Sequence, residues 1–225
     1  MVQSELKQPE AMIFDMDGTL FQTESLLERV HERLFAQLRA EGLYMQPTPP
    51  LERLLGCLGM LLEDIWKQVM PDGSPEAHHR ADELMLRYEL EDLQAGYGEL
   101  YPQVKETLET LHARGVKLFV ASNGLEDYVK GVAQHLHIDH LFTGLYSAGE
   151  FGTATKVELV AKLLSDHQLQ SAWMVGDRSS DVEAGAENGL PVIGCQYAGF
   201  GRGEELQGST ALIASFDELL ALGSA

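Results

Sequence analysis

Met12-Ile-Phe-Asp-Met-Asp-Gly-Thr-Leu20 is the segment that best indicates how this chain folds. Residues 12–14 form a short apolar run of the kind that becomes a buried strand, and the run ends at Asp15 and Asp17. Side chains two positions apart on a strand share a face, so both carboxylates can point into one site, and Gly18 permits a sharp turn after them. Two such carboxylates repel one another unless a cation lies with them, and Mg²⁺, which prefers oxygen ligands, would offset that repulsion. An isolated D-x-D is typical of a solvated turn, so the interpretation depends on matching signals downstream.

Composition excludes several classes of protein. The 225 residues carry a formal net charge of −19, from 16 Lys+Arg against 35 Asp+Glu. This balance argues against nucleic acid and anionic membranes as partners, because both bind clustered basic groups. It does not argue against a small anionic substrate, because a bound metal ion and one lysine can supply local positive charge that outweighs the net negative charge of the protein. The sequence has two cysteines, a polar N-terminal segment and no apolar run of membrane-spanning length, so we expect a cytoplasmic protein without a disulfide framework.

The first half of the chain after this segment has a helical pattern. Apolar residues at helical spacing predict a helix over 24–41, two short helices over 51–55 and 61–70, and a long helix from Pro75 to 94 with Ser74 as its N-cap. No strand pattern interrupts residues 22–98. We therefore expect these residues to form a small all-helical cap domain inserted after the first strand, between the two parts (1–21 and 99–225) of a core domain.

The second half alternates between strands and helices. Strands are predicted over 116–121, 141–146, 172–175, 192–193 and 211–214. Helices are predicted from Pro102, over 126–136, from Lys156, over 181–187 and after Ser215, which is expected to cap the last one. Together with the first strand, this order predicts an α/β fold with a doubly wound, Rossmann-like parallel sheet. Ligands of such sheets bind at the carboxyl ends of the strands, where the helical insertion would act as a lid. The glycine-rich run 199–203 lacks the strand–turn–helix context of a nucleotide-binding loop, so we interpret it as a flexible loop.

Four signals fall where such a sheet would bring them together. They are the Asp15 and Asp17 pair, Ser122 with the backbone N–H groups of Asn123 and Gly124, Lys156 at a helix start, and Asp177 with Asp181 after a strand. Backbone N–H groups and a hydroxyl hold phosphate oxygens, and a lysine suits a transferring phosphoryl group. Each signal has a structural alternative: Ser122 as a helix cap, Lys156 as a surface lysine, Asp181 as a helix N-cap. Their joint occurrence in this order favours a phosphate site.

The chain resembles the haloacid dehalogenase-like hydrolase superfamily, and most closely its phosphoglycolate phosphatase branch with a helical cap of the C1 type. The resemblance extends over nearly the whole chain. Its markers are Asp15-Met-Asp-Gly-Thr-Leu20, Leu100-Tyr-Pro-Gln-Val104, Ala121-Ser-Asn123, Lys156 and Gly176-Asp-Arg-Ser-Ser-Asp181.

The resemblance implies a phosphoric monoester hydrolase that acts on a small phosphorylated metabolite, phosphoglycolate-like or a sugar phosphate. Asp15 would be the nucleophile that forms an aspartyl-phosphate, and Asp17 the general acid and then the general base. Mg²⁺ would be held by the Asp15 carboxylate, the Asp17 backbone carbonyl and Asp177, with Asp181 in support. The phosphoryl oxygens would be bound by Ser122, Asn123 and Lys156. The protein is expected to be a monomer or a homodimer.

Two departures from the family pattern concern the substrate more than the reaction. Many relatives have Lys-Pro where this chain has Lys156-Val157, and many have an aspartate where Gln22 stands. The segment Gly56-Cys-Leu-Gly59 falls where relatives place a substrate-reading loop, so we interpret it as a candidate specificity element. We expect a surface or capping role for His135, His137 and His140, because they are not spaced as a helical zinc pair.

Other functions share these motifs. A β-phosphoglucomutase-like phosphomutase would return the phosphoryl group to a sugar rather than to water. A phosphonoacetaldehyde hydrolase needs a cap lysine, and Lys67 is the only lysine between Gln22 and Gly98. A receiver-type signalling domain also gathers acids, a hydroxyl and a lysine around Mg²⁺, but without a helical insertion after its first strand. A dehalogenase needs no second aspartate for a halide leaving group, so Asp17 favours a phosphate ester. A non-enzymatic Mg²⁺- and phosphate-binding protein is the remaining alternative.

Overall fold

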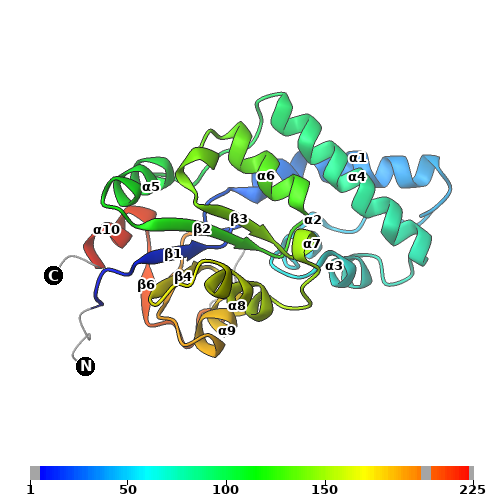
Figure 1. The fold of residues 1–225 in the computed structure, drawn as a ribbon. Helices are drawn as coiled ribbons and strands as arrows, with labels where there is room; N and C mark the ends of the chain where they lie inside the picture. Colours follow the sequence, from blue (N-terminus) through cyan, green and yellow to red (C-terminus); the bar gives the residue numbers. More distant parts are fainter. Residues whose placement is uncertain (1–5, 199–203, 223–225) are drawn as a thin grey trace.

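The computed structural model describes residues 6–198 and 204–222, and at their centre lies a six-stranded parallel sheet (Figure 1). The strand order is β3-β2-β1-β4-β5-β6, so the first strand lies in the middle of the sheet. This arrangement confirms the predicted doubly wound α/β fold. The glycine-rich run 199–203 lies outside the described residues. The strands are β1 (Ala11–Phe14), β2 (Lys117–Ser122), β3 (Gly144–Ser147), β4 (Ala172–Gly176), β5 (Val192–Cys195) and β6 (Ala211–Ile213).

Helices cover both faces of the sheet (Figure 1). Met12 and Phe14 of β1 pack on the face covered by α5 and α6, whereas Ala11 and Ile13 pack on the face covered by α8 and α9. This alternation explains why the strand reads as a continuous apolar run, since a parallel strand in this position is buried on both faces. The elements that cover the sheet and connect its strands are α5 (Val104–Ala113), α6 (Glu126–His135), η1 (Asp139–Leu141), α7 (Ala148–Phe151), α8 (Lys156–Asp166), α9 (Ser179–Glu187), η2 (Phe216–Glu218) and α10 (Leu219–Leu222).

A second group of helices lies to one side of the sheet, at the right of Figure 1. These helices are α1 (Thr23–Ala40), α2 (Leu51–Leu55), α3 (Leu62–Val69) and α4 (Pro75–Gln94). They enclose a hydrophobic cluster of their own, in which Leu34, Trp66 and Leu84 are fully buried. As predicted, Ser74 caps α4: its hydroxyl accepts a hydrogen bond from the Ala77 amide at 3.1 Å.

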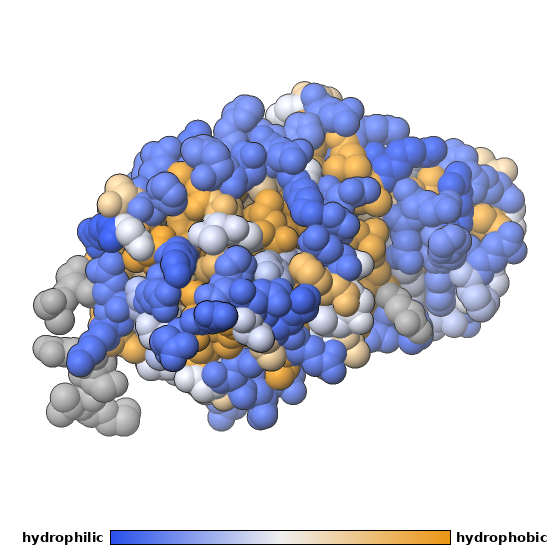
Figure 2. Space-filling model, in the orientation of Figure 1, coloured by the Kyte–Doolittle hydropathy of each residue, from blue (hydrophilic) through white to orange (hydrophobic). Residues whose placement is uncertain are grey.

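The chain leaves the sheet for these helices and returns from them along paired backbone segments. The Gln22 amide donates to the Glu99 carbonyl at 2.9 Å, and the Tyr101 amide donates to the Leu20 carbonyl at 3.0 Å. Together with the separate hydrophobic cluster, this pairing supports the proposed division into a helical cap domain (22–98) and a core domain. Figure 2 shows mostly hydrophilic side chains on this face of the molecule, with apolar ones visible between the helical group and the layers of the sheet.

Several predicted boundaries were wrong. The helix expected from Pro102 begins at Val104, because Gln103 has a left-handed conformation (φ 66°) that cannot continue from a helical turn. The strand expected over 141–146 is split: η1 ends at Leu141, and β3 begins only at Gly144, where pairing with β2 starts. Ser215 precedes a 3-10 turn but makes no capping hydrogen bond through its side chain.

Two further predictions concern the whole chain. In the described part of the chain, no helix combines the length and the apolar character needed to span a membrane. The two cysteines, Cys57 and Cys195, are buried and form no disulfide among these residues, as expected from their number.

Candidate active site

The candidate residues lie at the carboxyl ends of three adjacent strands. Asp15 directly follows β1, Ser122 is the last residue of β2, and Asp177 directly follows β4. β1 pairs with both neighbours, and by this register the three strands end within two residues of one another. The parallel sheet therefore brings Asp15 together with two residues that lie more than 100 positions further along the sequence, at the edge where such sheets bind ligands.

Gly18 brings the loop after β1 against Asp177. Its φ of +79° lies in the left-handed region, and a β-carbon at this position would overlap the Asp177 carboxylate. The neighbouring Thr19 is fully buried, and its hydroxyl donates to Oδ1 of Asp177 at 3.1 Å. The turn that follows the first strand thus also fixes the orientation of an acid from the fourth strand.

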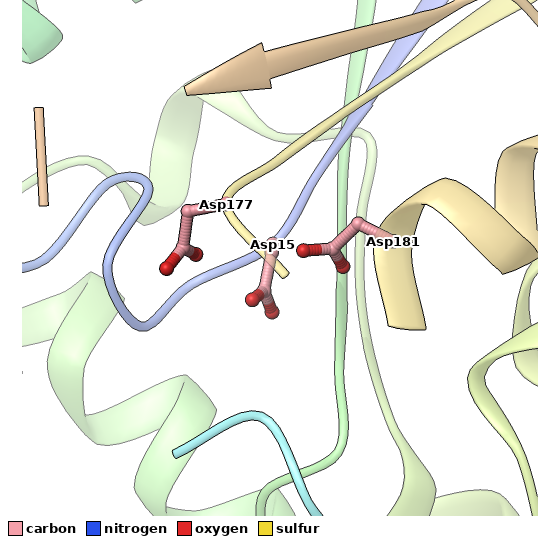
Figure 3. Close-up of side chains that lie close together, drawn as sticks. All are labelled: Asp15, Asp177 and Asp181. Carbon is pink, nitrogen blue, oxygen red and sulfur yellow. The ribbon is translucent and has the colours of Figure 1, made fainter. Parts of the chain in front are cut away.

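Three buried carboxyl groups meet beside this turn. Asp15, Asp177 and Asp181 each offer an oxygen, and these oxygens all lie within 4.8 Å of one another. Figure 3 shows the three side chains next to each other, with Asp15 in the middle. Burial, and after it the neighbouring Asp15 and Asp181 carboxylates, raises the pKa of Asp177 well above its usual range. Like charges this close are stable only with a proton or a cation among them.

This cluster fits a divalent metal ion. Oδ2 of Asp177 is buried and accepts no hydrogen bond, although Nε of Arg178 lies 3.5 Å from it, and Asp15 and Asp181 offer further oxygens. Hard divalent cations prefer such anionic oxygen ligands. In the part of the chain that the structure describes, no other group of His, Cys, Asp or Glu side chains is arranged to hold a metal, and His135 instead contacts the Gly131 carbonyl through Nδ1 at 2.8 Å.

Lys156 is a buried cation at the edge of the acid cluster rather than a surface lysine. It is the first residue of α8, and its Nζ lies 2.8 Å from Oδ1 of Asp15 and 2.6 Å from Oδ1 of Asp181. Burial alone would lower its pKa, but the two carboxylates outweigh burial and raise it. Lys156 therefore stays charged, neutralises part of the cluster and holds one oxygen of Asp15 in place.

Asp181 supports this arrangement from the first turn of α9. Its Oδ2 accepts a hydrogen bond from the Arg178 amide at 3.0 Å, while Oδ1 accepts from Lys156. The helix begins at Ser179 with Arg178 as its N-cap, so the interpretation of Asp181 as an N-cap, and the predicted start of the helix at 181, were wrong. Burial, and after it Asp15, raises the pKa of Asp181 to about 6.

Asp17 is not part of the acid cluster but lines the neighbouring pocket. Its Oδ1 accepts hydrogen bonds from the hydroxyls of Thr23 and Tyr128, each at 2.5 Å. Burial raises the pKa of Asp17 even though both hydrogen bonds lower it. A carboxyl group with a raised pKa can hold a proton close to neutral pH, as a general acid must. No sequence pattern pointed to Thr23 or Tyr128, because they reach Asp17 only through the packing of α1 and α6.

The residues after β2 differ in what their side chains contact. Ser122 is buried, and its hydroxyl accepts from the Gly124 amide at 3.1 Å. The Asn123 side chain does not lie free for a ligand: its Nδ2 donates to the Gly59 carbonyl at 2.7 Å, and its Oδ1 is buried without a partner. Phosphate binding by Asn123 through its backbone N–H stays a prediction.

A pocket opens above these residues, between the strand ends and the helical group. It encloses about 590 Å³ of empty space including its open mouth, and Asp15, Asp17 and Ser122 form its floor. Leu58, Gly59 and Met60 line its wall, which places the end of the predicted specificity segment 56–59 at the pocket. The other lining residues are Thr23, Leu62, Ile65, Asp82, Met85, Leu86, Glu89, Asn123, Gly124, Leu125 and Tyr128.

Gly59 ties the pocket wall to the core. Its φ is +86°, and a β-carbon there would lie 2.9 Å from Cγ of Arg178. The guanidinium of Arg178 in turn donates to the Leu55 carbonyl at 3.1 Å and to Glu205 at 2.8 Å. Hydrogen bonds from Asn123 and Arg178, both on the core side, therefore hold the turn between α2 and α3 in place.

The family model for haloacid dehalogenase-like hydrolases matches residues 12–195. This range runs from β1 to β5 and contains the four candidate aspartates Asp15, Asp17, Asp177 and Asp181, and the chain belongs to this family. The superfamily predicted from the sequence is thus confirmed. The six-stranded parallel sheet and the buried acids at its strand ends are those of a member of this superfamily.

Named relatives are similar over most of their length. The chain is 29% identical to a 5'-nucleotidase of Pseudomonas aeruginosa over 199 residues (87% of this chain and 86% of the relative). It is 28% identical to a phosphoglycolate phosphatase of Aquifex aeolicus over 182 residues (79% and 80%). The crystal structure of a predicted phosphoglycolate phosphatase from Haemophilus somnus has the same fold, with a TM-score of 0.82 at 21% identity, covering 97% of this chain and all of the other. The predictions of the family and of a phosphoric monoester hydrolase are confirmed.

Proposed function

We propose that this protein is a Mg²⁺-dependent phosphatase that hydrolyses a small phosphorylated metabolite through an aspartyl-phosphate on Asp15. One observation carries the proposal. Asp15 lies on the floor of the pocket, its Oδ1 is held by Lys156, and its Oδ2 is buried without a hydrogen-bond partner. A buried carboxylate oxygen without a partner is costly to a fold and suits a nucleophile.

The residues support a two-step reaction. Oδ2 of Asp15 attacks the phosphorus, the ester P–O bond breaks, and the leaving oxygen takes a proton from Asp17. A water molecule then attacks the phosphorus of the aspartyl-phosphate and gives a proton to Asp17, so that inorganic phosphate leaves and both aspartates return to their starting states. Thr23 and Tyr128, which donate to Oδ1 of Asp17, orient this acid toward the pocket.

The other polar groups of the site would bind the phosphoryl group. Lys156 would offset negative charge on the phosphoryl oxygens, with the Ser122 hydroxyl and the Asn123 backbone N–H as further contacts. Asp15, the Asp17 carbonyl and Asp177, with Asp181 in support, would hold Mg²⁺. When bound, the ion would supply positive charge for the phosphoryl oxygens in the transition state.

The relatives suggest two substrate classes, a nucleoside monophosphate or phosphoglycolate, beside the sugar phosphates expected from the sequence. A phosphomutase remains the alternative reaction, since it would use the same acids. A phosphonoacetaldehyde hydrolase has less support, because Lys67 lies 3.1 Å from Asp64 on an exposed part of α3 and is not among the residues that line the pocket. The cytoplasmic location and a monomeric or dimeric state stay predictions.

The proposal is tested by measuring phosphate release from a panel of small phosphate esters, with Mg²⁺ and with a chelator, for the wild type and Asp15→Asn. We expect Mg²⁺-dependent phosphate release by the wild type and none by Asp15→Asn. After an acid quench, labelled phosphate should be attached to the wild-type protein only. Near-normal turnover by Asp15→Asn would contradict the covalent mechanism. Isomerisation of a hexose phosphate without phosphate release would establish the mutase instead.

A further inference from the structure

One face of α4 forms the far wall of the pocket. Asp82, Met85, Leu86 and Glu89 all line it, and their spacing of i, i+3, i+4 and i+7 places them on a single side of the helix. The face therefore presents two apolar side chains between two acids. Oδ1 of Asp82 is already engaged, since it accepts a hydrogen bond from the Trp66 indole.

Glu89 differs from the other buried acid of the same helix. Asp92 is held by Arg29 and Arg33, with N–O distances of 3.2 and 2.7 Å. Glu89 is equally buried, at 4% exposed, yet its carboxyl group makes no hydrogen bond or ion pair with the residues that the structure describes. Burial, and after it the charge of Asp17, raises the pKa of Glu89 well above its usual range. A carboxyl group in this condition gains from any hydrogen-bond donor or cation that enters the pocket.

The rest of the pocket offers no cation to an anionic leaving group. Among the described residues, no lysine or arginine lines it. Lys156 lies beneath the floor, where it is occupied by Asp15 and Asp181. The wall is mostly apolar, and its aliphatic members are Leu58, Met60, Leu62, Ile65, Met85, Leu86 and Leu125. A carboxylate or a second phosphate placed here would lose water without gaining a cation, beside two acids.

We propose that the substrate is a phosphate monoester whose leaving group is uncharged or cationic, apolar over most of its length, and equipped with a hydroxyl or amino donor that Glu89 accepts. This inference rests on the proposed phosphatase function and narrows it. It makes Glu89 a specificity-determining residue. It also predicts that phosphoglycolate is a poor substrate, because its leaving group carries a carboxylate.

The test compares esters that differ only at the end of the leaving group. The probes are alkyl phosphates of two to six carbons that end in methyl, hydroxyl, ammonium or carboxylate, and kcat/KM is measured for each with Mg²⁺. Glu89→Gln removes the acid, Glu89→Asp keeps it, and Glu76→Gln changes an exposed acid of the same helix outside the pocket.

We expect the wild type to prefer hydroxyl and ammonium esters over carboxylate esters by at least about tenfold at the best chain length. Glu89→Gln is expected to lower the ratio of ammonium to methyl ester at least about fivefold, Glu89→Asp to preserve the order of the esters, and Glu76→Gln to change nothing. Carboxylate esters as the best wild-type substrates would overturn the inference, as would an equal effect of Glu89→Gln on every ester. Either result leaves the phosphatase intact, whereas no release from any ester, p-nitrophenyl phosphate included, would overturn the proposed function itself.

Discussion

Lys156 and Asp15 form an ion pair that is closed to solvent: Nζ lies 2.8 Å from Oδ1, and neither residue is more than 2% exposed. The same ammonium group pairs with Asp181. One cation thus compensates two acids from different elements of the fold. The ammonium group that would contact a transferring phosphoryl group is thus the same one that balances the charge of the acid cluster.

Replacing this lysine should therefore destabilise the protein. With Mg²⁺ absent, Lys156→Met leaves two buried carboxylates without their cation, a change that costs about 3–5 kcal/mol of unfolding free energy. Urea unfolding followed by circular dichroism measures it. Lys162→Met is the matched control, because Lys162 lies on the same helix and pairs with Asp166 at the surface; it should cost little. Equal effects of the two substitutions would contradict the role given to the buried pair.

The general acid can be tested through the leaving group. Asp17→Asn should lower kcat/KM about 10²–10⁴-fold for an alkyl phosphate, whose leaving oxygen needs a proton. For p-nitrophenyl phosphate the loss should be much smaller, since p-nitrophenolate leaves without one. Losses of the same size for both esters would mean that Asp17 acts in some other way.

Tyr128 should affect the pH dependence of the reaction. Its hydroxyl donates to Oδ1 of Asp17, and this hydrogen bond lowers the pKa of Asp17. Without it the pKa of Asp17 rises further, so the protonated acid survives to higher pH. Tyr128→Phe should therefore move the alkaline limb of the kcat/KM profile upward in pH.

Tyr146→Phe is the control for that experiment. Tyr146 is also buried and its hydroxyl also donates to an aspartate, Asp166, but it packs on the opposite face of the sheet from Tyr128. The substitution should leave the profile in place. A downward shift of the limb in Tyr128→Phe, or the same shift in both variants, would argue against the positioning role of Tyr128.

Metal binding has a readout that does not depend on turnover. Mg²⁺ that binds only the folded protein should raise its unfolding free energy by about 2.7 kcal/mol at 100 times its dissociation constant. Thermal unfolding at increasing Mg²⁺ measures this. Asp177→Asn should abolish most of the gain, whereas Asp127→Asn, an exposed acid on α6, should retain it. A full gain in Asp177→Asn would place the ion elsewhere.

The sheet and the strand-end acids could be predicted because both depend on local patterns. β1 and β4 are buried on both faces and are therefore continuous apolar runs, and their position in a parallel sheet requires Asp15 and Asp177 to meet. β3 was harder to delimit, because its first residues lie at the edge of the sheet and only pairing with β2 decides where the strand begins.

The contacts of the pocket could not be predicted for a different reason. Thr23, Tyr128 and Glu89 belong to three helices whose own patterns indicate only which face is buried. Their common approach to Asp17 is a result of how α1, α4 and α6 pack, and single-sequence periodicity carries no information about that packing. From the sequence alone, Glu89 cannot be distinguished from the other acids of a charged helix, and only its burial in the structure sets it apart.

The separate hydrophobic cluster of α1 to α4 has a consequence for how such an enzyme can diverge. The residues that would carry out the chemistry are anchored in the sheet, whereas most of the wall that would contact the leaving group belongs to helices stabilised by their own interior. Substitutions on the inner face of α4 can thus alter which alcohol is accepted without disturbing the acids beneath. A lineage can acquire new substrates through changes at a few wall positions while its catalytic machinery stays under constant selection.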